Sequence, residues 1–319
     1  MTERAGPIVA LLALAVVATG LMLGFEATGG SGDPLSGPRT AVVLVVRHEA
    51  GPLVAVVASG GGRRSSVVTI PSALALTVPG QGDARAGDAA LLPGRPAATA
   101  FSNLLGAWIS HHAVVDAQAL SEVIDRLGGL QVFADRLDGA GVVDALAAPG
   151  RFVTWGEVVR SLISSGPDWR QEDFVDVDDP AAVQRALAPA DPLVSTLPTA
   201  KVLGGLAVVD DLAAAELSAR VFGVEPVVPV PVVVLNGSGE PGVGAAVAEH
   251  LIRAGFRVVL SGNAADFNHR ETLVVASSPE DRDAAEGAQA ALGVGTVSVS
   301  GAPTGVGDVT IVVGKDFEG

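Results

Sequence analysis

The hydrophobic pattern of the chain begins with one long apolar segment. The 19 residues from Pro7 to Phe25 carry no charge, and a helix of that length spans about 28 Å, close to the thickness of a bilayer core. The pattern therefore predicts a membrane helix or a signal peptide. Residues 27–38 are rich in Gly, Ser and Pro and predict a flexible linker behind it.

The charges beside this segment predict its orientation. Arg4 is the basic residue on its N-terminal side, with Glu3 next to it, so the positive-inside rule favours a cytoplasmic N-terminus. Residues 1–26 would then be a cytoplasmic stub and a single transmembrane helix at about 7–25, with the bulk of the chain extracytoplasmic at the plasma membrane. Cleavage after Ala18 would leave the apolar stretch Leu21–Phe25 at the mature end, which favours a retained anchor. The cleaved form stays open.

Residues 39–222 alternate between short β-branched runs and helical stripes. Apolar residues between Leu120 and Leu127 recur at i, i+3, i+4 and i+7, which predicts a helix that ends at Gly128 and Gly129. Strands that alternate with helices predict a layered α/β (α+β) domain. The predicted strands are Thr40–Val46, Leu53–Ala58, Ser66–Ile70 and Ala113–Asp116.

A Pro-rich segment at residues 223–231 predicts a stiff linker to a second domain at residues 232–319. In that domain apolar runs and helical stripes follow the order βαββαββ. Ser278 and Pro279 occupy the N-cap and first positions of its second helix. The other predicted elements are strand Val230–Leu235, helix Val243–Ala254, and strands Arg257–Leu260, Thr272–Ala276, Thr296–Ser300 and Val309–Val313.

Composition narrows the possible functions. With 319 residues the chain has about twice the usual length of a domain. Its 35 acidic and 20 basic residues give a net charge of −15, which argues against a nucleic-acid partner because such partners require a basic surface. The absence of cysteine excludes disulfides, thiolate metal sites and a cysteine nucleophile.

The turn at 236–242 contains a literal GxGxxG between a strand and a helix. A dinucleotide site would also need an acidic residue after the next strand, and Ser261, Gly262 and Asn263 stand there instead. The turn could still offer backbone N–H groups to an anion or a sugar hydroxyl, or its glycines could serve the turn alone. The candidate binding residues are Asn236, Gly237, Ser238, Gly239 and Asn263.

Three other polar groups have simpler structural interpretations. The acidic residues Asp173, Asp176, Asp178 and Asp179 lack the ligand spacing of a calcium loop, which favours a solvated helix start before Pro180. Adjacent His111 and His112 point to opposite faces of a strand and cannot both ligate one metal. Arg63 and Arg64 lie at a predicted hairpin tip, where solvated charge is the ordinary interpretation.

Two blocks of the first domain resemble the LytR-CpsA-Psr family: SVVTIPSALALTVPG at 66–80 and ISHHAVVDAQALSEVIDRLGGLQV at 109–132. In the second domain VLNGSGEPGVGAAVAEHLIRAGFRVV, Gly262-Asn263 and DVTIVVGKDF resemble the LytR C-terminal domain. The resemblance implies a membrane-anchored protein that transfers a glycopolymer phosphate from a polyprenyl pyrophosphate carrier to peptidoglycan, with magnesium, arginines and carboxylates.

The sequence departs from that family where the chemistry lies. The family motif Ile-Pro-Arg-Asp is replaced by Ile70, Pro71, Ser72 and Ala73, and the family's Ser-Asp-Thr is replaced by residues 51–53, Gly-Pro-Leu. These losses predict a non-catalytic accessory protein, a scaffold or binding protein of cell-wall polymer assembly, without a cofactor. Its expected partners are cell-wall glycopolymer, peptidoglycan, a polyprenyl-linked precursor or envelope proteins.

An active phosphotransferase remains the alternative to this interpretation. It would need magnesium and a relocated anion site, for which Arg63, Arg64 and Arg160 are the candidates, together with the acidic group at 173–179. Transcriptional control, a third possibility, conflicts with the negative net charge and with the lack of a helix-turn-helix pattern.

Overall fold

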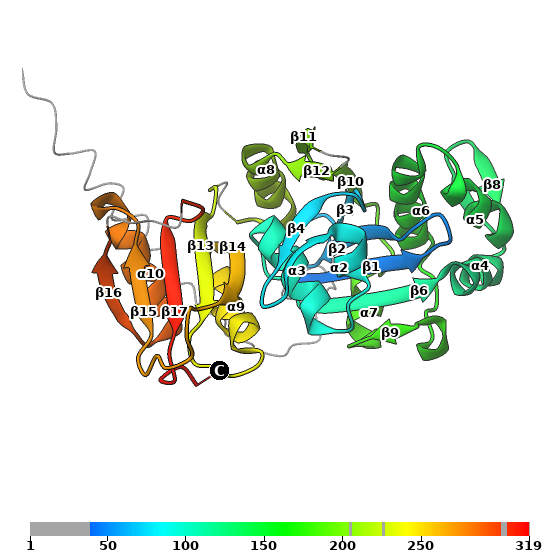
Figure 1. The fold of residues 1–319 in the computed structure, drawn as a ribbon. Helices are drawn as coiled ribbons and strands as arrows, with labels where there is room; N and C mark the ends of the chain where they lie inside the picture. Colours follow the sequence, from blue (N-terminus) through cyan, green and yellow to red (C-terminus); the bar gives the residue numbers. More distant parts are fainter. Residues whose placement is uncertain (1–38, 204–205, 225–226, 301–304, 319) are drawn as a thin grey trace, which may run out of the picture. The chain divides into compact units, whose positions relative to one another are not determined.

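The computed structural model describes residues 39–203, 206–224, 227–300 and 305–318. The predicted membrane segment at 7–25 and the linker at 27–38 lie outside these residues. Among the helices within them, none has the length and apolar character that crossing a membrane requires. We refer to residues 39–222 as the first domain and to residues 230–318 as the C-terminal domain, and Figure 1 labels their elements.

The first domain consists of one large sheet, three two-stranded additions and helices. Its strands are β1 (Thr40–Arg47), β2 (Leu53–Ser59), β3 (Ser66–Ile70), β4 (Ala75–Val78), β5 (Gly82–Arg85), β6 (His111–Asp116), β7 (Leu130–Val132), β8 (Asp135–Leu137), β9 (Asp176–Val177), β10 (Leu193–Thr196), β11 (Thr199–Leu203) and β12 (Leu206–Val209). Its helices are α2 (Ala86–Ala90), α3 (Arg95–Leu105), α4 (Ala117–Arg126), α5 (Gly139–Ala147), α6 (Arg151–Ser165), α7 (Pro180–Ala186) and α8 (Asp211–Phe222), with the 3-10 turn η1 (Gln171–Asp173).

The large sheet has the strand order β10-β3-β2-β1-β6-β9. Strand β1 pairs antiparallel with β2, with Val43 opposite Val56, and parallel with β6, with Leu44 opposite Ala113. Strands β1, β3, β6 and β10 run in the same direction, so their carboxyl ends meet at one edge of the sheet. The four predicted strands of this domain are confirmed, as is the mixed α/β class.

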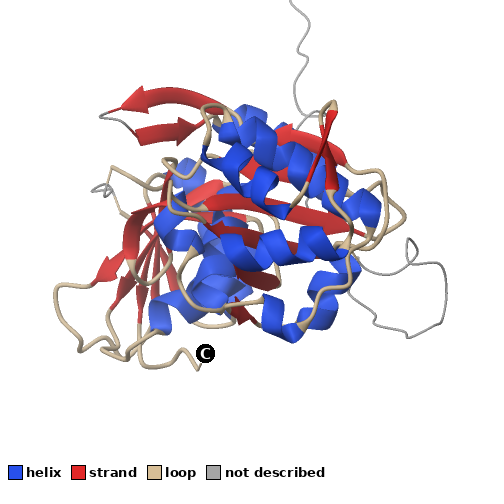
Figure 2. Ribbon diagram, turned by 90° about the vertical axis from the view of Figure 1, so that its right-hand side faces the viewer, coloured by secondary structure: helices blue, strands red, loops and turns tan. Residues whose placement is uncertain are grey.

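Helices cover both faces of this sheet (Figure 2). Along β1, Val42, Leu44 and Val46 pack into one core, while Val43 and Val45 pack into the other. The first core is closed by side chains of α4, α5, α6 and α7, and the second by side chains of α2, α3 and α8. Burial on both faces explains why β1 and β2 are nearly continuous apolar runs instead of alternating.

The C-terminal domain confirms the predicted βαββαββ order. Its elements are β13 (Val230–Asn236), α9 (Val243–Arg253), β14 (Phe256–Asn263), β15 (Leu273–Ala276), the 3-10 turn η2 (Pro279–Asp281), α10 (Arg282–Leu292), β16 (Thr296–Val299) and β17 (Val309–Val313). The sheet order is β14-β13-β17-β15-β16, so β14 is an edge strand. Helices α9 and α10 contribute to one shared core against the sheet.

The predicted N-cap at Ser278 differs from the structure. Ser278 opens the 3-10 turn η2 and makes no side-chain cap hydrogen bond; its hydroxyl donates to the Asp281 carboxylate, at 2.6 Å. The α-helix itself starts at Arg282. Pro279 sets the first turn, as predicted, but that turn is 3-10, a common form at helix N-termini.

The prediction that the acidic residues near Pro180 are solvated is wrong for one of them. Asp179 caps α7 through a hydrogen bond from the Ala182 N–H, which confirms the helix start and lowers the pKa of its carboxyl. Asp173, however, is buried, at 3% exposure. It accepts from the Arg126 guanidinium at 2.5 Å and from the Arg170 N–H at 2.8 Å. It therefore ties η1 to α4.

We expect Asp173→Ala to lower the free energy of unfolding by about 2–3 kcal/mol, because it leaves the Arg126 guanidinium and a backbone N–H without their acceptor. Asp179→Ala, which removes a half-buried helix cap, should lower it by about 1 kcal/mol. Urea denaturation measures both. Equal losses would contradict a buried structural role for Asp173.

Candidate functional site

The carboxyl edge of the large sheet gathers charged residues from separate elements. Arg47 ends β1 and Asp116 ends β6, and the two are register partners with 3.6 Å between guanidinium and carboxylate. Both side chains are about half exposed. The Arg47 charge is thus matched by a carboxylate on the neighbouring strand.

The loop after β1 is held by the first residue of α6. The Arg151 Nη1 donates to the Gly51 carbonyl at 3.2 Å, and its guanidinium lies 5.3 Å from the Phe152 ring centroid. In the same loop the His48 ring is hydrogen-bonded to the Val143 carbonyl at 3.2 Å. Arg151 and His48 therefore fix the loop through backbone groups.

The residues that replace the family's charged motif are packing positions in the structure. Gly87 in α2 approaches them so closely that a Cβ there would lie 2.9 Å from both Pro52 Cγ and Ser72 Cβ. The Gly87 N–H also donates to the Ser72 carbonyl at 2.9 Å. Helix α2 thus rests directly on the two loops at this edge.

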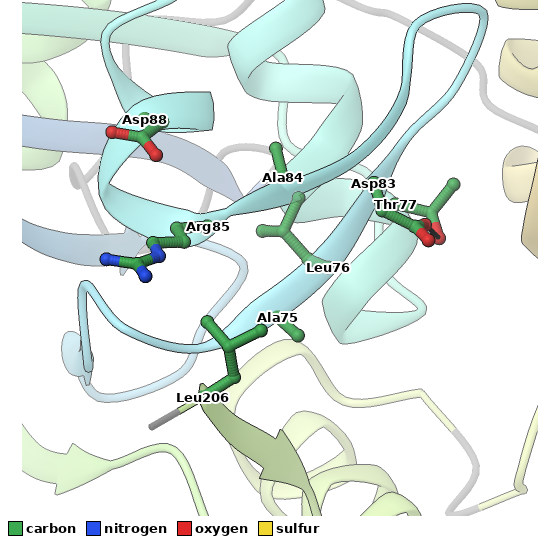
Figure 3. A pocket seen from close by; sticks show the side chains of 8 residues that line it. All are labelled: Ala75, Leu76, Thr77, Asp83, Ala84, Arg85, Asp88 and Leu206. Atoms are coloured by element: carbon green, nitrogen blue, oxygen red, sulfur yellow. Dashed lines mark hydrogen bonds between the residues drawn. The ribbon is translucent and has the colours of Figure 1, made fainter. Parts of the chain in front are cut away.

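A pocket of about 530 Å³ lies beside these loops. Figure 3 shows its walls, which come from the β4–β5 hairpin, α2 and the start of β12. Apolar side chains form its body, while Arg85 and Asp88 lie toward one end and Thr77 and Asp83 toward the other. The lining residues are Ala75, Leu76, Thr77, Asp83, Ala84, Arg85, Asp88 and Leu206.

The hairpin that forms this pocket is ordered by its own pairing. Leu76 lies opposite Ala84 and Thr77 opposite Asp83, and the Thr77 hydroxyl donates to the Asp83 carboxylate at 3.1 Å. The Arg85 side chain is exposed. Among the described residues, the lining thus combines an apolar body with one cation, Arg85, and two carboxylates, Asp83 and Asp88, a mixture of apolar and polar groups that is typical of small-molecule pockets. Sequence reasoning did not identify this pocket; the alternation of Leu76 and Val78 with the smaller residues Ala75 and Thr77 was the available signal.

The alternative anion site is only partly assembled. Arg64 donates to the Asp191 carboxylate and, from Nε, to the Asp191 carbonyl at 2.7 Å. The Arg160 Nε donates to Glu157 at 2.8 Å. This bond lowers the pKa of Glu157 and raises the pKa of Arg160. The charge of Asp191 also raises the pKa of Arg160. Arg64 and Arg160 thus both interact with Asp191. Each already has a carboxylate partner, which is Asp191 for Arg64 and Glu157 for Arg160.

Arg63 takes a different position from these two arginines. A Cβ on Gly223, whose φ is +77°, would lie 2.5 Å from the Arg63 guanidinium carbon. Burial lowers the pKa of Arg39 to about 10, and the charge of Arg63 acts in the same direction. The tip of the β2–β3 hairpin therefore carries Arg63 against the end of α8.

The turn at 236–242 uses its polar groups internally. The Asn236 Oδ1 accepts from the N–H groups of Ser238 and Gly239 at 3.1 and 3.0 Å and from the Ser238 hydroxyl at 3.0 Å. Its Nδ2 donates to the Glu240 carbonyl at 2.9 Å, and the Glu240 N–H donates to the Ser238 hydroxyl at 3.1 Å. The N–H groups that could have held an anion therefore have acceptors within the turn.

The glycines of this turn have packing reasons. A Cβ on Gly237 would lie 2.7 Å from the His269 ring, and one on Gly239 would lie 3.0 Å from Phe267. Gly239 also has a φ of +81°, which favours glycine. Asn263 is the register partner of Asn236 across β13 and β14 and is exposed. The structure thus brings these two candidates together at one strand end.

The two histidines of β6 do face different surroundings, as predicted. His112 is fully buried, with its Nε2 2.8 Å from the Ala90 carbonyl and its Nδ1 3.7 Å from Asp176. His111 faces Asp178, at 3.7 Å. Within the described part of the chain, no group of three or more His, Asp or Glu side chains is arranged to hold a metal ion.

Comparison with known proteins identifies the C-terminal domain. Residues 229–317 match the family model for LytR, cell envelope-related transcriptional attenuator. They form a LytR C-terminal domain. No curated protein matches the chain.

Solved structures identify the fold of the remaining chain. A Bacillus subtilis protein described as a transcriptional regulator, ywtF, is 14% identical with a TM-score of 0.51, over 64% of this chain and 98% of that one. TagT bound to LIIa-WTA is 13% identical with a TM-score of 0.50, over 62% and 95%. A LytR-CPS2A-psr family protein, YwtF (TagT) with bound octaprenyl pyrophosphate lipid, is 14% identical with a TM-score of 0.48, over 62% and 95%. The likeness to the first two structures shows that the chain combines their fold with a LytR C-terminal domain, as the resemblance predicted.

We expect Asn236→Ala to lower the free energy of unfolding by about 1–3 kcal/mol, because the turn loses its central acceptor and leaves N–H groups without partners. Asn263→Ala, at the exposed partner position, should change it by less than about 0.5 kcal/mol. Thermal unfolding of both variants measures this. A turn whose Asn236 serves a ligand alone would show no such difference.

Proposed function

We propose that this chain is a membrane-anchored, extracytoplasmic accessory protein of cell-wall polymer assembly, which binds a polyprenyl-linked glycopolymer precursor without transferring it. The family of the C-terminal domain is described as cell envelope-related, and TagT, which has the fold of the first domain, is bound to LIIa-WTA in its structure. Both support a function in the cell envelope.

The pocket behind the β4–β5 hairpin is the observation that carries the proposed ligand. Leu76, Ala84 and Leu206 give it an apolar body, and Arg85 is the cation at its rim. A polyprenyl chain would fill the apolar body, and its pyrophosphate would lie against Arg85. Hydrogen bonds between a guanidinium and a phosphate are stronger than bonds between neutral groups, because both partners are charged. Asp88 lies at the same end as Arg85 and Asp83 at the other, so Arg85 is the one cation that the described part of the chain places in the pocket lining, and binding of the pyrophosphate would depend on it.

The packing at the sheet edge supports binding over catalysis. Phosphoryl transfer requires cations placed on the transferring group. Pro52 and Ser72 occupy the motif positions here, with Gly87 packed on both. Arg47 and Arg151 at that edge have other partners, since Arg47 faces Asp116 and Arg151 donates to Gly51.

The ligand proposal predicts a specific effect of Arg85. The full-length protein should bind octaprenyl pyrophosphate in detergent micelles, and Arg85→Gln should weaken binding about tenfold, which is about 1.4 kcal/mol. Arg282→Gln removes the same charge from an exposed position of α10 and should leave the affinity unchanged. Equal weakening by both variants would show nonspecific attraction and contradict the pocket.

The same samples test the non-catalytic part of the proposal. With magnesium added, the wild-type protein should release no phosphate from the lipid, as in a magnesium-free control. Magnesium-dependent cleavage would instead favour the active phosphotransferase, and cleavage lost on Arg64→Gln or Arg160→Gln would locate its site beside Asp191.

Membrane anchoring through residues 7–25 forms the remaining part of the proposal. In intact cells an external protease should digest the part of the chain after residue 38, while an epitope placed at the N-terminus stays protected. Recovery of the digestible part from the medium without membrane extraction would indicate a cleaved signal peptide. Full protection of the chain would contradict the extracytoplasmic placement.

A further inference from the structure

The β4–β5 hairpin has two neighbours in the structure. It forms a wall of the pocket described above, through Leu76 and Ala84. It also contacts β14 of the LytR C-terminal domain, and the hairpin and β14 lie within one compact unit of the chain. The hairpin therefore stands between the candidate site and the second domain.

A buried amide joins α3 to the edge of the C-terminal sheet beside this hairpin. Asn103 is 3% exposed. Its Nδ2 donates to the Val258 carbonyl, and its Oδ1 accepts from the Val258 N–H, both at 2.8 Å. The side chain thus pairs with edge strand β14 as a neighbouring strand would, and it leaves neither group of Val258 unsatisfied in a dry environment.

The hairpin itself adds three contacts to the same domain. The Thr77 hydroxyl lies within hydrogen-bonding distance of the Val259 carbonyl, at 3.3 Å. At the hairpin tip the Gly80 N–H donates to the Ser261 hydroxyl at 2.9 Å, and a Cβ on Gly80 would lie 3.1 Å from the Ala245 nitrogen. The tip therefore lies against the first turn of α9.

A second cavity, of about 220 Å³, lies on this boundary. Its walls include Ala75, Leu76 and Thr77, the three β4 residues that also line the larger pocket, together with Arg257 and Val258 of β14. A small shift of β4 would therefore change both cavities. Strands β4 and β5 form a two-stranded sheet of their own, and such a pair is marginally stable in isolation. Its position therefore depends on packing from both domains: Leu76 and Val78 lie in the second core of the first domain, and β14 of the C-terminal domain contacts both strands.

We infer that the LytR C-terminal domain positions the β4–β5 hairpin and thereby sets the shape of the ligand pocket, with Asn103 and the tip contact at Gly80 as positioning groups. The ligand named for that pocket rests on the proposed function; the positioning of the hairpin does not. Because linkage is reciprocal, a ligand that fixes the hairpin also strengthens the contact between the domains.

The test displaces the hairpin from the C-terminal side. Ala245→Leu inserts a larger side chain against the Gly80 tip without lining the pocket. Ala290→Leu, the same change at an exposed position of α10, is the matched control. Asn103→Leu, which removes the amide pairing, is a second variant with a different mechanism. Full-length proteins are compared by amide hydrogen exchange and by octaprenyl pyrophosphate binding.

We expect Ala245→Leu and Asn103→Leu to speed exchange of the amides at 75–85 by roughly tenfold and to weaken lipid binding about fivefold. Exchange in β1 and the behaviour of Ala290→Leu should match the wild type. Wild-type exchange at 75–85 in Ala245→Leu, with the rest of the protein folded, would overturn the inference. Absence of lipid binding by the wild type would refute the proposed ligand, and hairpin exchange would still decide the positioning.

Discussion

Burial of the large sheet on both faces is the constraint from which the rest of the first domain follows. Side chains of β1 alternate between two separate cores, so neither face of the sheet can hold solvated polar chemistry. Charged groups are confined to strand ends and loops, where Arg47, Asp116 and Arg151 are found. The candidate pocket lies outside the sheet, beside the β4–β5 hairpin, whose Leu76 and Val78 side chains pack into the second core.

The apolar pattern was sufficient to predict most of the architecture. Runs such as Ser66–Ile70 and Val309–Val313 coincide with strands β3 and β17, because β-branched segments between turn residues have few other favourable conformations. Short elements with mixed composition were not predicted. Strands β4 and β5, with sequences ALTV and GDAR, are held by contacts with residues far along the chain, including Val259 and Ser261, and local periodicity contains no information about such partners.

The same limit applies to charged residues. The acidic residues at 173–179 are chemically identical but lie in different environments. Asp179 caps a helix, whereas Asp173 is buried against Arg126. Only the distant arginine distinguishes them. Likewise the sequence left two interpretations of the Asn236 turn open, and the structure accounts for its polar groups through hydrogen bonds within the turn. A sequence motif identifies polar groups that could bind a ligand. Whether those groups already have hydrogen-bond partners within the protein depends on the fold.

Both domains contain a glycine that close packing requires. Gly87 and Gly237 each permit an approach that a Cβ would block, against Ser72 in one case and His269 in the other. Replacing such a glycine would move a helix or a loop, whereas replacing a charged residue at a sheet edge leaves the core intact. The fold therefore constrains a glycine at a close contact more strongly than a charged residue at the edge of the sheet.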